Sequence, residues 1–242
     1  MPLLTIQPFP ARALSAPEPL ASGLHCGICG TRHAPEACER SAVRCNVRAF
    51  RHEKFTVWRC PSCGCLGRLE PLKIAPYYAD YPVHGPGEEP GWWQSRICAN
   101  VLRYLLRAGL SRTARILDYG CGNGQFVRYL RQRGFDGAQG YDPFMEAFRD
   151  PAALRRKYDA LVSMEVLEHA ERPLDLLAQW KARLNPGGLL LLTTPNACGI
   201  DLAAPGDAIH SLHQPYHFHI FAPGILRRRL EEAGFEVLRL AE

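Results

Sequence analysis

One stretch constrains the fold of this chain more than any other: an apolar run that ends in an acid and enters a glycine-rich turn. Residues 116–124 read Ile-Leu-Asp-Tyr-Gly-Cys-Gly-Asn-Gly, with an amphipathic segment after them. This order predicts a strand, a tight turn and a helix. The glycines allow a ligand to approach the backbone, and the start of the helix offers free N–H groups. Asp142 lies 22 residues after Gly120 at the end of the next apolar run, where a nucleotide-type site needs an acceptor for ribose hydroxyls.

Three later segments complete the pattern. Residues 158–169 predict a buried strand followed by a Glu-His pair, and residues 184–194 predict a turn followed by a continuous apolar strand. Residues 217–235 read His-Phe-His-Ile-Phe-Ala-Pro, then a helix and a glycine. With the glycine-rich turn, these segments resemble the class I (Rossmann-like) S-adenosylmethionine-dependent methyltransferases, and the last one resembles a subgroup that carries an N-terminal zinc ribbon. The resemblance covers residues 24–242.

The resemblance implies an α/β fold with a doubly wound, mainly parallel sheet. Only sixteen residues separate Asp142 from Asp159, so we expect the third strand of the family to be missing. The sequence ends directly after an expected sixth strand at 235–240, so we also expect no seventh strand. We predict that residues 235–240 pair directly with the strand at 189–194. The alternative is a strand donated by a partner chain or by a second copy.

Composition divides the chain into four parts. We expect a mobile tail at 1–23, a zinc-ribbon module at 24–70, a linker at 71–93 and the methyltransferase domain at 94–242. The formal net charge of +5 is uneven, because residues 1–75 carry ten Lys and Arg against five Asp and Glu. Such a surplus is typical of a solvated basic face or of a surface for an anionic or nucleic-acid partner.

Ten cysteines in a chain without a recognisable export signal predict reduced thiols or metal ligands. Two C-x-x-C pairs, with thirty residues between them, predict a closed tetrahedral Zn²⁺ site and an inserted hairpin. The expected ligands are Cys26, Cys29, Cys60 and Cys63. Three other cysteines leave alternatives open: Cys65 in place of Cys63, and Cys38 with Cys45 as a second site or as free thiols.

The resemblance also implies which residues hold the cofactor, S-adenosylmethionine. Asp118 would lie near the methionine ammonium, and Asp142 would accept both ribose hydroxyls, unless it is an ordinary acid at a strand end. The remaining candidates lie in the glycine-rich turn and at the end of the 160–164 strand: Gly120, Cys121, Gly122, Gly124, Met164 and Glu165. For Glu165, capping of the next helix is an equal alternative.

Histidines supply the candidate catalytic groups. In the resembling zinc-ribbon sugar C-methyltransferases, a histidine of the late segment can act as base, and His217 holds the comparable place here. Imidazole titrates near neutrality and can take a proton from a hydroxyl, an amine or an activated carbon. His169 is the second candidate. For both residues, packing and hydrogen bonding within the fold is the competing interpretation.

Three functions compete at this point. The leading one is methyl transfer to a small-molecule acceptor, such as a sugar-derived or secondary metabolite. The second is methylation of RNA gripped by the basic zinc module, and the third is a non-catalytic methyltransferase-like partner subunit. No apolar run reaches the ~20 residues of a membrane helix, so we expect no membrane partner and a cytoplasmic protein.

Overall fold

A parallel sheet forms the centre of the C-terminal region in this computed structural model, which describes residues 23–78 and 91–241. The expected tail lies outside the described residues except for Gly23. The sheet contains β6 (Ile116–Tyr119), β7 (Gln139–Tyr141), β8 (Tyr158–Met164) and β9 (Leu184–Thr193), in the order β7-β6-β8-β9. All three pairings are parallel. The expected doubly wound α/β fold is confirmed.

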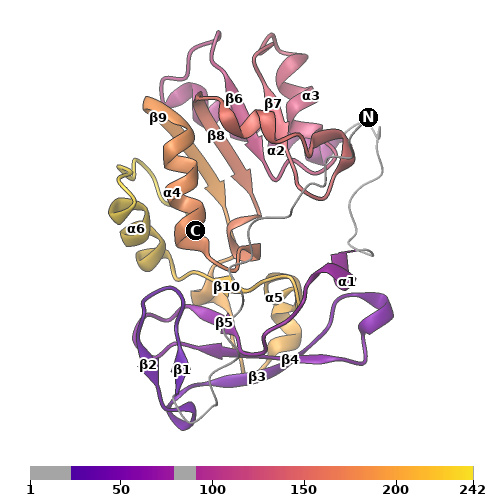
Figure 1. The fold of residues 1–242 in the computed structure, drawn as a ribbon, viewed down its shortest axis with the longest axis vertical. Helices are drawn as coiled ribbons and strands as arrows, with labels where there is room; N and C mark the ends of the chain where they lie inside the picture. Colours follow the sequence, from indigo (N-terminus) through magenta and orange to yellow (C-terminus); the bar gives the residue numbers. More distant parts are fainter. Residues whose placement is uncertain (1–22, 79–90, 242) are drawn as a thin grey trace, which may run out of the picture.

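Helices cover both faces of this sheet (Figure 1). On one face, α2 (Trp92–Arg107) and α3 (Gln125–Arg131) bury apolar side chains against Ile116 and Val162. On the other face, Leu177 and Trp180 of α4 (Pro173–Arg183) share a buried cluster with Leu117 and Leu161 of the strands. Because successive side chains of a strand point to opposite faces, one apolar strand serves both layers.

The third strand of the family is absent from this sheet, as expected. Residues 143–157 instead form two short 3-10 helices, η4 (Glu146–Phe148) and η5 (Pro151–Arg155). The carboxyl end of β7 is therefore followed by a compact loop rather than by a helix and a strand.

The prediction for the sixth strand was wrong. After α6 (Pro223–Glu232), residues 235–241 form no strand, and β8 is the one strand in the described part of the chain that pairs with β9. Helix side chains hold this segment instead: Lys181 of α4 lies over the Phe235 ring, and Arg239 lies over the ring of Tyr104 on α2. Leu189–Leu192 are accordingly only half-buried, because no ladder covers the outer edge of β9.

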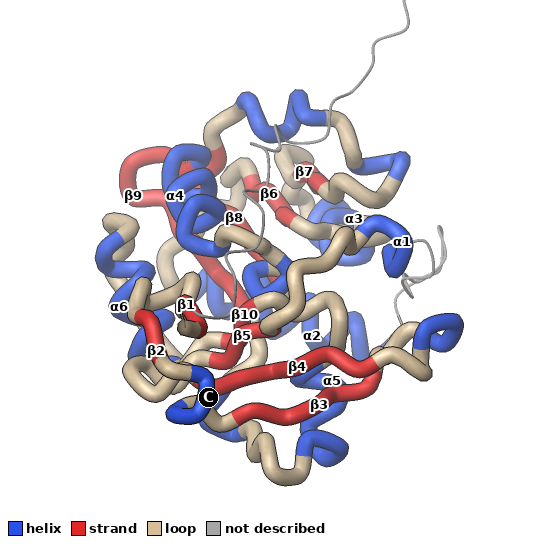
Figure 2. Tube along the Cα trace, turned by 60° about the horizontal axis from the view of Figure 1, so that its bottom comes forward, coloured by secondary structure: helices blue, strands red, loops and turns tan. Residues whose placement is uncertain are grey.

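The N-terminal residues form two antiparallel sheets. In the first, β1 (Leu24–His25) pairs with β2 (Arg32–His33). In the second, β3 (Arg40–Arg44) and β4 (Lys54–Arg59) form the hairpin expected between the cysteine pairs. Figure 2 shows these two long strands side by side across the lower part of the molecule.

A strand from the far end of the chain completes the second sheet. Its order is β10-β5-β4-β3, in which β5 is Leu66–Arg68 and β10 is His219–Ile220. The two remaining helices are short: α1 is Ala75–Tyr78 and α5 is Ile209–Leu212. Figure 1 shows α5 and β10 beside the N-terminal strands. The residues just before β10 are thus held between the two regions. No helix among the described residues is both long enough and apolar enough to cross a membrane.

Candidate functional site

The two cysteine pairs meet at one point. Each pair sits on a tight turn, in which the N–H of Gly30 donates to Cys26 O and the N–H of Gly64 donates to Cys60 O, both at 2.8 Å. Both glycines have positive φ (78° and 73°), a conformation that side chains with a Cβ rarely adopt. This shared geometry turns the sulfurs of Cys26, Cys29, Cys60 and Cys63 toward one another, within 4.8 Å.

The sulfur spacing fits a tetrahedral metal site. The Sγ–Sγ distances are 3.7 Å for Cys26–Cys63 and 3.6 Å for Cys29–Cys60. Zn–S bonds of about 2.3 Å at tetrahedral angles would place the sulfurs about 3.8 Å apart. Cys65 lies outside the cluster, where its sulfur accepts from the Ala222 N–H at 3.3 Å. The cluster therefore fits a zinc ribbon with Cys63, not Cys65, as the fourth ligand.

Cys38 and Cys45, the candidates for a second metal site, belong to no group of potential metal ligands among the described residues. Cys38 donates to Ala34 O at 3.5 Å, and Cys45 packs in an apolar cluster with Phe55 and Tyr77. Burial raises the pKa of both thiols. This geometry is that of free thiols, the other alternative from the sequence.

The glycine-rich turn joins β6 to α3 at the carboxyl edge of the parallel sheet. Gly120 and Gly124 both have φ of +77°. A Cβ at Gly120 would lie 2.3 Å from Val166 Cγ2, and one at Gly124 would lie 2.2 Å from the ring of Phe148. Glycine is needed at both positions, since the backbone conformation and the packing exclude a side chain. The close packing also brings the loop after β8 against the glycine turn.

Two acids flank this turn. Asp142 accepts from the Gly122 N–H at 3.0 Å and from the Phe144 N–H at 2.9 Å, so its carboxylate is oriented by the turn itself. Asp118, the third residue of β6, is 2% exposed, and no basic side chain of the described residues lies within ion-pair distance of it. Burial, with a smaller contribution from Asp142, raises the pKa of Asp118 to about 7. A buried, uncompensated carboxyl group is suited to a cationic ligand.

Between Gly120 and Gly122, the glycine-rich turn carries a cysteine. Cys121 is half-buried and donates to the Gly122 carbonyl at 3.7 Å. Burial raises its pKa, so it stays protonated at neutral pH and is a lining residue rather than a nucleophile.

An aromatic residue that was not among the predicted site residues also lies at this edge. Phe148 of η4 lies against Gly124 and also within 2.9 Å of where a Cβ at Gly140 would stand. Its backbone carbonyl accepts from the Asp142 N–H at 3.0 Å. The only sequence signal was an aromatic residue in a segment too short for the third strand, and that segment's path could not be predicted.

At the end of β8, Met164 is half-buried and Glu165 is exposed. Glu165 has φ of +54°, and its N–H donates to Thr193 O at 3.0 Å. A non-glycine residue in this conformation is uncommon and tends to occur at functional sites. The Glu165 carboxylate makes no hydrogen bond to a helix N-terminus within the described ranges, so the capping alternative gains no support.

Glu168, His169 and His217 converge next to this strand end. Their ligand-type atoms all lie within 4.8 Å of one another, and the two imidazole centroids are 4.9 Å apart. Glu168 and His169 belong to the 3-10 helix η6 (Leu167–His169). Val166, which packs on Gly120, lies two residues before Glu168, so the cluster is next to the glycine turn. The structure therefore brings both predicted catalytic histidines together, and adds a glutamate that the sequence did not single out for chemistry.

Residues 213–218, here called the histidine loop, are held from both sides. Gln214 is buried, and its side-chain amide donates to Leu212 O and His217 O at 2.8 and 2.9 Å. From the N-terminal region, Arg68 donates to the Pro215 carbonyl and lies 4.1 Å from the Phe218 ring centroid. The N-terminal region thus supports the histidine loop directly.

Burial sets the protonation states of this cluster. It lowers the pKa of His169 to about 3 and that of His217 to about 4. It raises the pKa of Glu168 to about 8, with a further contribution from Glu165. The His217 Nδ1–H donates to Ser211 O at 2.7 Å. Because this bond fixes the tautomer, Nε2 carries the lone pair at neutral pH.

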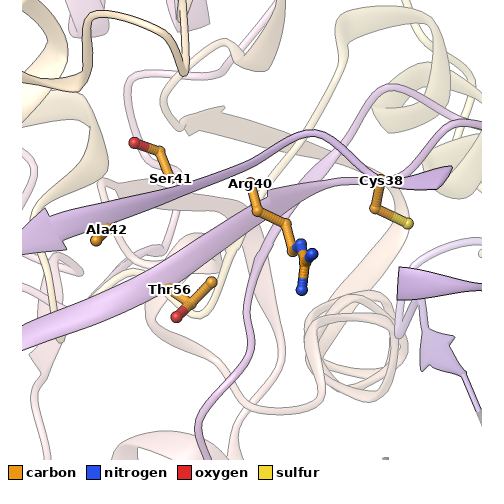
Figure 3. A pocket seen from close by; sticks show the side chains of 5 residues that line it. All are labelled: Cys38, Arg40, Ser41, Ala42 and Thr56. Carbon is orange, nitrogen blue, oxygen red and sulfur yellow. The ribbon is translucent and has the colours of Figure 1, made fainter. Parts of the chain in front are cut away.

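A separate surface hollow of about 370 Å³ lies over the β3–β4 hairpin. Figure 3 shows its lining side chains, among them Arg40 and Thr56 from the two strands and Cys38 just before β3. None of the predicted cofactor, catalytic or metal residues lines it.

Comparison with known proteins finds methyltransferases among the relatives. The ubiquinone biosynthesis O-methyltransferase of Dinoroseobacter shibae is 27% identical over 198 residues, which cover 71% of this chain and 75% of that protein. The tRNA U34 carboxymethyltransferase of Geobacter sp. (strain M21) is 33% identical over 102 residues, which cover 33% of this chain. The chain spans about a third of the length of that relative, 32%.

Among solved structures, the magnesium protoporphyrin IX methyltransferase of Synechocystis PCC 6803 with bound SAH matches with a TM-score of 0.45 and 18% identity. The match covers 65% of this chain and 83% of that one. A family model described as a methyltransferase domain matches residues 91–240, which is more than half of the chain. The chain therefore belongs to the class I S-adenosylmethionine-dependent methyltransferases.

Proposed function

We propose that this chain binds S-adenosylmethionine at the carboxyl ends of β6, β7 and β8 and transfers its methyl group to a small-molecule acceptor beside the histidine loop. One observation carries the proposal: the glycine turn stands between two acids of different character. Asp118 is buried without a basic partner, and Asp142 is oriented by the turn. Such a pair suits a ligand with a cationic group at one end and vicinal hydroxyls near the other.

S-adenosylmethionine, when bound, supplies a methyl group that its sulfonium already activates. The residues of the chain have to bind, orient and exclude water. Asp118 faces the ammonium, Asp142 accepts from the ribose, and the glycines let the turn approach the ligand. Phe148, which packs on Gly124, is placed to contact the adenosine part. Met164 and Glu165 border the acceptor side.

His217 acts on the acceptor, either as the base or as an orienting group. Its pKa of about 4 keeps the imidazole neutral at physiological pH, and Nε2 is free to accept a proton. His169 packs beside it, with 4.9 Å between ring centroids, and it restricts where an acceptor can lie. The His217 ring is buried and the His169 side chain is half-buried, which favours a compact, small-molecule acceptor over a large one.

We also propose one structural Zn²⁺ per chain on Cys26, Cys29, Cys60 and Cys63. The ion would hold the two turns of the module together and, through Arg68, stabilise the histidine loop. Four thiolates leave no open position for chemistry.

Two measurements test the main proposal. Calorimetric titration with S-adenosylmethionine should show one site per chain, and an absence of binding would overturn the cofactor assignment. Incubation with methyl-labelled cofactor, first with a small-molecule extract and then with RNA, should place the label among the small molecules. Label in RNA alone would reject the acceptor class while leaving the cofactor site intact.

RNA remains the second candidate because of one surface. The hairpin β3–β4 and its connection hold no acidic residue between Arg40 and Arg51. Its exposed basic side chains are Arg40, Arg44, Arg48, Arg51 and Lys54. The tRNA-modifying relatives point the same way. Binding to RNA would weaken steeply with salt, because each neutralised phosphate releases counterions, and a flat salt profile would reject it.

A further inference from the structure

In the cluster of Glu168, His169 and His217, two facing atoms, His217 Nε2 and Glu168 Oε1, make no hydrogen bond to each other. His217 Nε2 lies 3.9 Å from Glu168 Oε1, too far for a hydrogen bond. Within the described residues, Oε1 is fully buried and makes no hydrogen bond, and the nearest titrating neighbour besides the histidines is Glu165. A buried polar atom without a partner costs free energy, and such a cost is typical of a site that holds a ligand.

Both groups are held in orientations typical of ligands. The His217 Nδ1–H donates to a backbone carbonyl, Ser211 O, at 2.7 Å, which directs the Nε2 lone pair into the cluster. The other carboxylate oxygen of Glu168 accepts from Thr194 Oγ1 at 2.9 Å, which leaves Oε1 for the cluster. Metal-bound imidazoles and carboxylates are commonly held in this way by a second hydrogen bond.

We propose that Glu168, His169 and His217 bind a divalent first-row transition cation, distinct from the zinc of the cysteine module. The ligand atoms lie within 4.8 Å of one another. The 3.9 Å between Oε1 and Nε2 is within the roughly 4.2 Å that two ligands of about 2.1 Å can span across one ion. Two imidazoles and one carboxylate favour Zn²⁺, Fe²⁺, Co²⁺ or Mn²⁺ over Mg²⁺ or Ca²⁺, which prefer oxygen ligands.

The location of the cluster gives the ion a use. Three protein ligands leave a coordination position open, as in catalytic rather than structural sites. Val166, two residues before Glu168, packs on the glycine turn, so the open position lies near the proposed cofactor. If the chain transfers methyl groups as proposed above, the ion would bind an oxygen of the methyl acceptor and lower the pKa of that oxygen. His217 would then orient the acceptor through the ion instead of taking its proton.

The test uses the zinc-loaded full chain and Co²⁺ as the probe, with neither cofactor nor acceptor present, so that its failure is separable from failure of the proposed function. Wild type should bind one further Co²⁺ per chain, with visible bands but without the intense thiolate-to-cobalt absorption of a cysteine site. Glu168→Gln, which keeps the size of the side chain, should weaken this binding at least tenfold. His210→Ala, an exposed histidine nearby, is the matched control and should bind as wild type does.

Thr194→Val provides a second variant, should Glu168→Gln fail to fold. It removes the hydrogen bond that orients Glu168, and the affinity should fall several-fold with the ligands intact. Three results would overturn the proposal: no second equivalent of Co²⁺ in wild type, a second equivalent with thiolate absorption, or undiminished binding in both variants. Preference for Mg²⁺ over Co²⁺ would reject the transition-ion class.

Discussion

The cysteine cluster and the carboxyl edge of the parallel sheet use buried polar groups in opposite ways. In the cysteine cluster, four sulfurs from two equivalent turns stand at the spacing of one tetrahedral ion. At the sheet edge, Asp118 and Glu168 are buried with raised pKa values of about 7 and about 8. The first arrangement is closed, as in structural metal sites. The second keeps costly groups uncompensated in the fold, as expected where a ligand is to be bound.

The comparison predicts different consequences of mutation. Changes in the cysteine cluster should lower stability, and changes at the sheet edge should lower binding or turnover while leaving the fold intact. Each of the following experiments tests that division.

The largest effect is expected from removing the zinc ligands. Cys26→Ser with Cys60→Ser should abolish zinc binding and unfold residues 24–70, because structural zinc contributes on the order of 10 kcal/mol to small modules. Elemental analysis and hydrogen exchange measure the two effects. Exchange should also rise in the histidine loop, which Arg68 supports. Cys198→Ser, an exposed thiol, is the control, and full zinc content in the double variant would contradict the prediction.

His217→Ala comes next. With an acceptor identified, turnover should fall about 100-fold or more, whether the imidazole acts as base or through an ion. Cofactor affinity should stay close to wild type, and the free energy of unfolding should fall modestly, because His217 is buried and donates to Ser211 O. Steady-state kinetics measure the turnover, with His210→Ala as the control variant. Near-normal turnover in His217→Ala would show that His217 only packs within the fold.

Asp142→Ala should weaken cofactor binding at least tenfold, since a hydrogen bond to a charged group contributes roughly 1.5–3 kcal/mol. Calorimetry with S-adenosylmethionine measures the loss. Asp136→Ala, an exposed acid before β7, should bind normally. Equal affinity in wild type and Asp142→Ala would remove Asp142 from the ribose site.

The smallest effect is a pH dependence from Asp118. Its pKa is 3.8 when unperturbed and about 7 in the fold, so between these values the folded state binds a proton that the unfolded chain lacks. The stability from this group is complete below about pH 4 and is lost as pH rises through about 7, by at most ~1.4 kcal/mol per pH unit. Denaturant titrations of wild type and Asp118→Asn from pH 5 to 8 isolate it from other titrating groups. Parallel stability curves would contradict the assignment.

The sequence determined the parts of this protein that depend on near neighbours. Glycines at alternate positions fix the turn after β6, since only they tolerate its positive φ angles. Continuous apolar runs gave β8 and β9, and sixteen residues were too few for the third strand. The two C-x-x-C turns gave the cysteine cluster, because each turn brings its own pair of sulfurs together before any long-range packing.

Long-range packing decided the rest. Phe235–Leu240 has the apolar content of a strand, yet contacts with Lys181 and Tyr104 hold it outside the sheet. Strand propensity says that a residue packs well on a pleated, half-buried surface. Whether the segment reaches such a surface depends on tertiary contacts.

The Glu168–His169–His217 cluster shows the same limit at the level of the site. His217 lies 48 residues after His169 in sequence, and their rings meet only because β10 joins the N-terminal sheet and Gln214 fixes the loop before it. The sequence supplied the ligand types, and the docking of two distant segments decided which of the nine histidines stand together. Spacing along a chain predicts distance only within a turn, a helix or a strand; beyond those, burial of apolar surface sets which side chains meet.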